Sequence, residues 1–246
     1  MSRWRLANAA IAAAGLLLTS PGGANVSPRI SIIIDDLGYE LEAGRRAIDL
    51  PGPLAYAILP GTPRARILAE LANDNGKEVL LHLPLQAAEY DGPIEPGSIM
   101  LDMSRTAFQA AFDSAIESVP FAVGVSSHRG SLLTRHPGHM GWLMEEIQRR
   151  EGLFFIDSYT THESVALRIA AESGVTAIKR DVFLDHNQRP EAVRAEFQRL
   201  IKLARLRGKA VGIGHPYPAT LELLEREIPR LAKEGIELVP ISQLIT

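Results

Sequence analysis

The chain of 246 residues is 46% hydrophobic and 22% charged, an ordinary globular composition that argues against a disordered protein. Its net charge of −3 gives no electrostatic reason to bind nucleic acid, because such binding usually needs a strongly basic surface. The sequence contains no cysteine, which excludes disulfides, thiolate metal sites and a cysteine nucleophile. Any metal ligands must therefore come from His, Asp or Glu.

The first 24 residues have the layout of an export signal. Arg3 and Arg5 precede an apolar run over residues 6–18, and small residues then lead to Ala24. The apolar run is shorter than the roughly 20 residues that a membrane span needs. We therefore predict a cleaved signal peptide over residues 1–24 and an exported, periplasmic protein, with an uncleaved N-terminal membrane anchor as the alternative. Residues 25–246 show no linker or composition break and are predicted to form a single domain.

Beyond the signal, short apolar runs alternate with segments of helical spacing. Apolar residues recur every three to four positions in those segments, and a glycine such as Gly152 or Gly208 separates each pattern from the next run. This alternation predicts an α/β fold with seven to eight mostly parallel strands, which could close into a barrel or form an open sheet. Residues 86–102 are predicted to form a long loop. The expected strands cover residues 29–34, 54–59, 78–83, 122–126, 153–156, 176–179, 210–213 and 238–241.

Four of these runs carry unusual polar residues at or near their ends. Asp35 and Asp36 follow the first run, His82 lies in the third, and His128 and His215 come after the fourth and seventh. A helix cap could explain one of the two aspartates, and His82 alone could be a hydrogen-bonded core residue. Since parallel strands end at one edge of a sheet, we expect all five side chains to converge. Carboxylate and imidazole together suit Zn²⁺ or another divalent first-row metal.

Other polar residues near strand ends have more ordinary explanations. Asp157 ends the fifth run and could cap a helix, and Arg180 with Asp181 could form a simple ion pair. Alternatively, Arg180 and Asp181 orient a catalytic group, as charged residues do in many active sites. The remaining histidines are interpreted as peripheral residues: His136, His139, His162 and His186.

The motifs, taken in order, resemble the signature of the divergent polysaccharide deacetylase family. They cover residues 33–38, 81–84, 124–131, 155–158, 180–185 and 214–218, so the resemblance extends over nearly the whole chain after the signal. It implies an irregular, polysaccharide deacetylase-like (β/α) barrel. It also implies a divalent metal ion, usually zinc, held by one Asp and two His. Ser126 and Ser127 precede His128 where this branch of the superfamily usually has two Asn.

The resemblance also implies roles for individual residues. Asp35 becomes the catalytic base and His215 the general acid, while Asp36, His82 and His128 become the metal ligands. Four further residues lie in the motifs and are predicted to bind or orient the substrate: Ser131, Asp157, Arg180 and Asp181.

The expected function is metal-dependent removal of acetyl groups from a cell-envelope polysaccharide, with peptidoglycan as the first candidate. The main alternative is a non-catalytic metal- or glycan-binding envelope protein on the same scaffold, because a fold does not fix a function. A glycosidase with Asp157 and Asp181 as its paired acids is a third possibility. Metal dependence separates these hypotheses, since such a glycosidase needs no metal and a binding protein shows no turnover.

Overall fold

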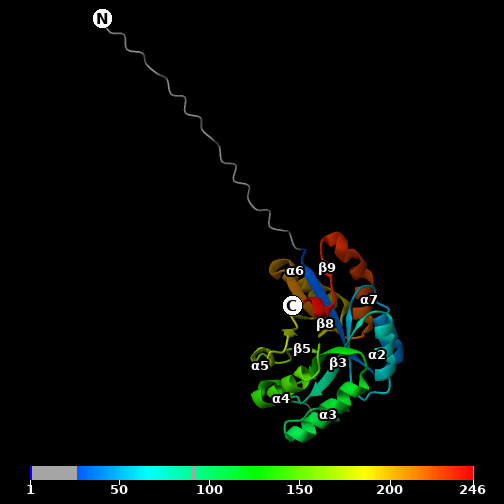
Figure 1. The fold of residues 1–246 in the computed structure, drawn as a ribbon. Coiled ribbons are helices and arrows are strands. Elements are labelled where there is room, and N and C mark those ends of the chain that lie inside the picture. Colours follow the sequence, from blue (N-terminus) through cyan, green and yellow to red (C-terminus); the bar gives the residue numbers. More distant parts are fainter. Residues whose placement is uncertain (2–26, 90–91, 246) are drawn as a thin grey trace.

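The computed structural model describes Met1 and residues 27–89 and 92–245, so the predicted signal peptide lies outside the described residues except for Met1. A curled sheet forms its centre, and every strand pairing in that sheet is parallel. The strand order is β6-β5-β4-β3-β2-β1-β8-β7, with β9 paired to β1 (Figure 1). The strands are β1 (Arg29–Leu37), β2 (Ala55–Ile58), β3 (Glu78–Leu85), β4 (Ala122–Arg129), β5 (Phe154–Asp157), β6 (Ala177–Lys179), β7 (Val182–Phe183), β8 (Lys209–Gly214) and β9 (Glu237–Leu238).

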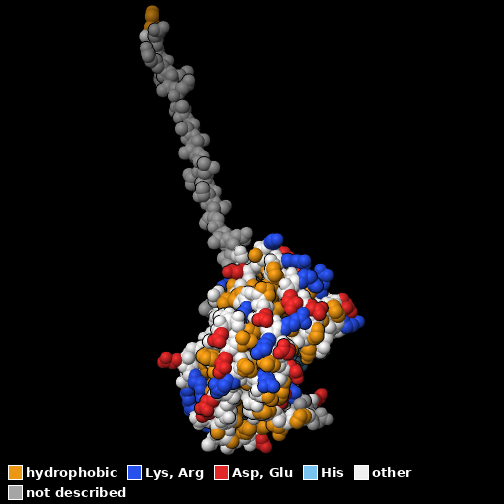
Figure 2. All heavy atoms as spheres, turned by 90° about the vertical axis from the view of Figure 1, so that its right-hand side faces the viewer, with side chains coloured by type: hydrophobic (Ala, Val, Ile, Leu, Met, Phe, Trp, Pro, Cys, Tyr) orange, Lys and Arg blue, Asp and Glu red, His pale blue; other side chains and the backbone are white. Residues whose placement is uncertain are grey.

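Helices cover the outer face of this sheet (Figure 1). None of the described helices is both long enough and apolar enough to span a membrane. On the face shown in Figure 2, basic and acidic side chains are interspersed, in keeping with the nearly balanced composition. The helices are α1 (Leu41–Ile48), α2 (Ala65–Asp74), α3 (Arg105–Ser118), α4 (Pro137–Gln148), α5 (Ala166–Glu172), α6 (Pro190–Arg207) and α7 (Pro218–Glu227), with 3₁₀ turns η1 (Leu133–Arg135), η2 (Ile228–Glu234) and η3 (Ile241–Gln243).

The two edges of the sheet are the consecutive strands β6 and β7. Strand β6 pairs with β5 and β7 pairs with β8, so only Arg180 and Asp181 separate the two edges along the chain. The prediction of an irregular (β/α) barrel with mostly parallel strands is thus confirmed. The structure has one strand more than the eight expected, because residues 177–183 form two short strands. The first, β6, pairs with β5, and the second, β7, pairs with β8.

The inner face of the curled sheet changes from apolar to polar along the strands. Ile33, Leu80, Ile156 and Ile213 are buried together inside the curl. Because alternate residues of a strand point to the same face, the residues two positions further on also point inward. Asp35, His82, Ser158 and His215 occupy those positions. The carboxyl ends of the strands therefore carry a polar cluster above an apolar floor.

Four predicted strand ends differ from the structure by two residues or more. The first strand does not stop at residue 34, because β1 continues through both aspartates to Leu37. The fourth continues to Arg129, since β3 also lengthens and Pro84 pairs with His128. The predicted strand over 238–241 ends at Leu238, and Pro240, which lacks an N–H to donate to a neighbouring strand, precedes the turn η3.

Candidate metal centre

A β-bulge in β1 brings the two aspartates to the same place. Ile34 pairs with Tyr56 and Leu37 with Ile58, so Asp35 and Asp36 together oppose a single residue of β2. Asp36 has a φ of 62°, a left-handed conformation that is uncommon for a residue with a Cβ. The bulge lets both carboxylates lie near His82, with Asp35 Oδ2 at 3.5 Å and Asp36 Oδ1 at 3.1 Å from its Nε2.

Three potential ligand atoms converge above the apolar floor. Asp36 Oδ1 lies 3.1 Å from His82 Nε2 and 2.9 Å from His128 Nδ1, and the two nitrogens are 3.1 Å apart. Ligand atoms of a tetrahedral ion, each about 2.0–2.1 Å from it, are separated by roughly 3.3 Å. Asp36 Oδ1 is buried and makes no aligned hydrogen bond. A carboxylate oxygen and two imidazole nitrogens in this arrangement fit a divalent first-row metal ion.

Each imidazole is held from its other side. His82 Nδ1 lies 2.7 Å from Ser126 Oγ, so the serine that replaces the usual Asn contacts a candidate ligand. His128 Nε2 lies 3.1 Å from Glu95 Oε2, and Arg129 donates to the second oxygen of Glu95. Such outer contacts fix the orientation of a metal-binding imidazole and its tautomer. Sequence reasoning missed Glu95, because an acid within the 86–102 loop shows no periodicity and follows no strand.

A second histidine–carboxylate pair lies beside this group. His215 Nδ1 is 2.8 Å from Asp185 Oδ1, and its Nε2 faces Asp36 Oδ2 at 3.6 Å. Asp185 is buried and also accepts hydrogen bonds from the His215 main-chain N–H and the Thr220 hydroxyl. The sequence motif ending at Asp185 was noted, but no role was assigned to that residue. The pair directs Nε2 of His215 toward the candidate metal site.

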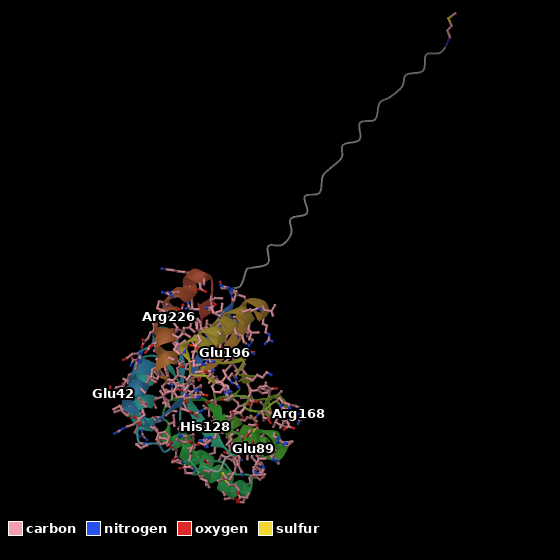
Figure 3. All side chains as sticks on the ribbon, turned by 180° about the vertical axis from the view of Figure 1, so that it is seen from behind. Glu42, Glu89, His128, Arg168, Glu196 and Arg226 are labelled. Atoms are coloured by element: carbon pink, nitrogen blue, oxygen red, sulfur yellow. The ribbon has the colours of Figure 1, made fainter. Side chains whose placement is uncertain are left out.

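These groups surround a cavity of about 190 Å³ at the carboxyl ends of the strands. In Figure 3, His128 lies within the body of the fold, whereas Glu42, Arg168 and Arg226 lie at its periphery. The cavity brings together six of the predicted site residues: Asp35, Asp36, His82, His128, Arg180 and His215. Among the described residues, no other group of three or more His, Asp or Glu side chains has this metal-binding geometry.

Comparison with known proteins identifies the family. The model of the divergent polysaccharide deacetylase family matches residues 32–245. The chain belongs to this family. One relative is the uncharacterized protein YibQ of Escherichia coli K12. The two sequences are 37% identical over 233 residues, which cover 95% of this chain and 71% of YibQ.

Solved structures share the fold of this divergent deacetylase family member. An uncharacterized protein of Agrobacterium tumefaciens C58 has a TM-score of 0.85 and 22% identity, covering 91% of this chain and 92% of its own. The peptidoglycan deacetylase PdaC of Bacillus subtilis has a TM-score of 0.52 and 11% identity, and the match covers 89% of this chain and 90% of PdaC. A CE4 family pseudoenzyme of Bacillus anthracis has a TM-score of 0.53 and 14% identity, and the match covers 89% of this chain and 66% of the pseudoenzyme. At these identities the three structures establish the fold alone.

The surroundings of the two aspartates shift their pKa values in opposite directions. Burial raises the pKa of the Asp35 carboxyl, although the nearby His82 and His215 partly oppose this. Burial would also raise the pKa of Asp36, but the adjacent His128 and His82 rings hold it well below its usual range. Asp36 therefore stays ionised, as a metal ligand must, while Asp35 is the better proton acceptor near neutral pH.

The pKa values of His128 and His215 are both raised. Burial would lower the pKa of His128, but its contacts with Asp36 and Glu95 raise it to about 9. Burial likewise opposes protonation of His215, yet its hydrogen bond to Asp185 raises the pKa above the ordinary value. His215 can thus carry a proton at neutral pH, as a general acid requires.

The structure places the other predicted residues in different surroundings. Arg180 lines the cavity and donates to the main-chain oxygens of Ser158 and Tyr159, at 2.7 and 3.1 Å. Asp157 is buried and accepts hydrogen bonds from Tyr159 N and Ser164 Oγ, so it shapes the loop after β5.

Two further predicted residues, Ser131 and Asp181, lie outside the cavity lining, as Asp157 does. Ser131 accepts a hydrogen bond from Ala88 N and links two loops. Asp181 pairs with Arg207 at 3.2 Å and accepts from Val211 N. Because Asp157 and Asp181 are each bound to other groups and do not share this cavity, the geometry gives no support to a glycosidase acid pair.

Proposed function

We propose that this divergent polysaccharide deacetylase family member is an active, metal-dependent deacetylase of a cell-envelope polysaccharide. The observation that carries the proposal is the convergence of Asp36 Oδ1, His82 Nε2 and His128 Nδ1 beside the buried Asp35. These three residues would hold the divalent ion, with zinc as the first candidate. The proposed export signal in residues 1–24 would deliver the protein to the periplasm, where such a polysaccharide is found.

The chain's own groups can supply the proton transfers of acetyl hydrolysis. A bound metal ion would polarise the acetyl carbonyl and make water more acidic. Asp35 Oδ1 is buried without a hydrogen-bond partner, and Asp35 accepts the proton of the attacking water. His215 is held by Asp185 and donates a proton from Nε2 to the leaving amine or hydroxyl. Arg180 lines the same cavity, and the Asp35 carboxylate favours its charged form, so Arg180 contributes a positive charge beside the reacting groups.

Peptidoglycan is the first substrate to test. The support comes from the proposed export and from PdaC of Bacillus subtilis, a peptidoglycan deacetylase with the same fold. The alternative is a glycan- or metal-binding protein without turnover, and the Bacillus anthracis pseudoenzyme shows that this fold can exist without activity. The presence of both Asp35 and His215 in one cavity favours turnover over binding alone.

The test compares acetate release and bound metal in three forms of the zinc-loaded protein. Asp35→Asn keeps the shape of the side chain but cannot accept a proton at neutral pH. It should lose on the order of 10²–10⁴ in rate while retaining its zinc. Asp74→Asn, an exposed residue at the end of α2, serves as the matched control and should change neither quantity. If the parent protein releases no acetate from peptidoglycan or chitin oligosaccharides, the binding-protein alternative is favoured.

A further inference from the structure

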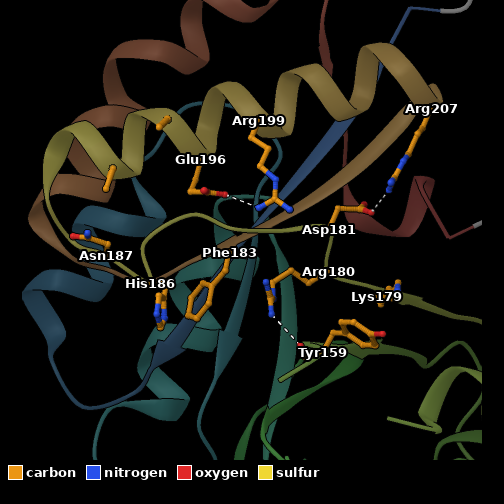
Figure 4. Close-up of a pocket in the computed structure, with 12 residues that line it drawn as sticks. Tyr159, Lys179, Arg180, Asp181, Phe183, His186, Asn187, Glu196, Arg199 and Arg207 are labelled. Atoms are coloured by element: carbon orange, nitrogen blue, oxygen red, sulfur yellow. Dashed lines mark hydrogen bonds and ion pairs between the residues drawn. The ribbon is translucent and has the colours of Figure 1, made fainter. Parts of the chain in front are cut away.

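A second, larger cavity adjoins the candidate metal centre. It has a volume of about 710 Å³ and lies between α6 and the connection of β6 to β7 (Figure 4). Arg180 and Phe183 line both cavities, so the two spaces are neighbours that share a wall. A ligand whose reacting group occupied the smaller cavity could therefore extend into the larger one. None of the proposed proton transfers uses this second space.

Positive charge is in excess in the larger cavity. Four cationic side chains line it, Lys179, Arg180, Arg199 and Arg207, against the two carboxylates of Asp181 and Glu196. Each carboxylate is already paired, Asp181 with Arg207 at 3.2 Å and Glu196 with Arg199 at 2.9 Å.

The other two cations have no carboxylate partner in the cavity. Lys179 Nζ lies 4.0 Å from the centre of the Tyr159 ring. Arg180 stacks on Phe183, and its two hydrogen bonds go to the neutral main-chain oxygens of Ser158 and Tyr159. Two of the five N–H groups of Arg180 are used in this way, which leaves others for a ligand.

Two guanidinium groups of this cavity face the same space. Arg199 extends from α6 toward Arg180, which comes from the opposite wall (Figure 4). Burial lowers the pKa of Arg180, the carboxylates of Asp35 and Asp157 partly oppose this, and the Arg199 cation lowers it again, so the Arg199 charge acts on Arg180. Like charges held together in a partly buried space are unfavourable unless an anion lies between them. Guanidinium groups bind carboxylates and phosphates with two parallel hydrogen bonds.

We infer that the larger cavity binds the acidic group of an anionic saccharide, placed between Arg180 and Arg199 while the acetyl group occupies the adjoining metal centre. This inference rests on the proposed function and names its substrate class: a glycan that bears carboxylates or phosphates near the acetylated sugar. Tyr159 and Phe183 each carry a cation over one face, and the rest of their ring surface gives the sugar ring apolar contact. A neutral glycan gains nothing from the excess positive charge.

The experiment uses two matched pairs of saccharides with the zinc-loaded full chain. The first pair is a peptidoglycan-derived tetrasaccharide and the same compound with its carboxyls reduced to alcohols. The second is tetra-N-acetylchitotetraose with and without an O-linked phosphate, which distinguishes a preference for phosphate from one for carboxylate. For each pair, kcat/KM for acetate release and the calorimetric Kd are measured at low and at high salt.

The acidic member of at least one pair should be preferred, and salt should weaken that preference because it screens the charges. Arg199→Gln should reduce the preference about threefold to tenfold, since the lost pairing is charge-assisted but half exposed. Arg194→Gln, an exposed arginine of α6 that does not line the cavity, is the control and should leave the preference unchanged.

Equal kcat/KM and equal Kd for the acidic and neutral members of both pairs would overturn the inference. So would an Arg199→Gln variant with the same preference as Arg194→Gln. If no saccharide releases acetate, the proposed function fails, yet the Kd values of the four compounds still test the anionic site by themselves.

Discussion

Removal of the metal should make the stability of the protein depend on pH through His128. In the metal-free protein, Asp36 and Glu95 raise the pKa of His128 to about 9 from 6.5 in the unfolded chain. Between these values the folded state holds one proton more than the unfolded state, so stability falls as pH rises. The difference corresponds to roughly 3 kcal/mol, at about 1.4 kcal/mol for each pH unit. The stabilisation is fully present below about pH 6.5 and lost above about pH 9.

The assay is urea unfolding in EDTA at several pH values across this window, for the parent and two variants. The parent should lose about 3 kcal/mol of unfolding free energy from low to high pH, relative to His128→Gln. Replacement of the exposed His162 by Gln should leave the parent's pH dependence intact. A zinc-loaded parent should not show this loss, because the metal replaces the proton on His128. An equal pH dependence in the parent and His128→Gln would refute the reasoning.

Three further predictions address the surroundings of the site and the export signal. Glu95→Gln should weaken zinc binding about 10- to 100-fold in a competition titration, since it removes the charge that orients His128; unchanged affinity would show that Glu95 has no such role. Asp185→Asn should move the alkaline limb of the pH–rate profile to lower pH, because Asp185 raises the pKa of His215; an unmoved limb would argue against His215 as the acid. Intact-mass analysis of envelope-fraction protein should give a chain that begins at Asn25, whereas a full-length cytoplasmic product would exclude export.

The alternation of apolar runs and helical spacing predicted the fold well. Buried parallel strands are apolar on both faces, so they appear as continuous runs in the sequence. The alternation could not predict the bulge at Asp35 and Asp36, because a one-residue insertion appears only when β1 is paired with β2. It also missed the division of residues 177–183 into β6 and β7 at the two opposite edges of the sheet, which places Arg180 in the lining of both cavities.

The candidate site was predictable where a polar residue followed an apolar run. Asp36, His128 and His215 were found in that way and His82 as a polar residue within a run, and the structure brings the four together. Glu95 was not predictable, since its role depends on how a long loop folds back over β4. Asp181 followed a strand as well, but its side chain pairs with Arg207 of α6, a contact that the local sequence does not indicate.

The most direct test of this account is the zinc content of the purified chain, measured by elemental analysis. We expect about one bound ion per chain in the parent and in the control His162→Ala. We expect loss of that ion in Asp36→Ala, His82→Ala and His128→Ala, each of which removes one of the three converging atoms. Full retention of stoichiometric zinc in His128→Ala would contradict the assignment of the metal centre.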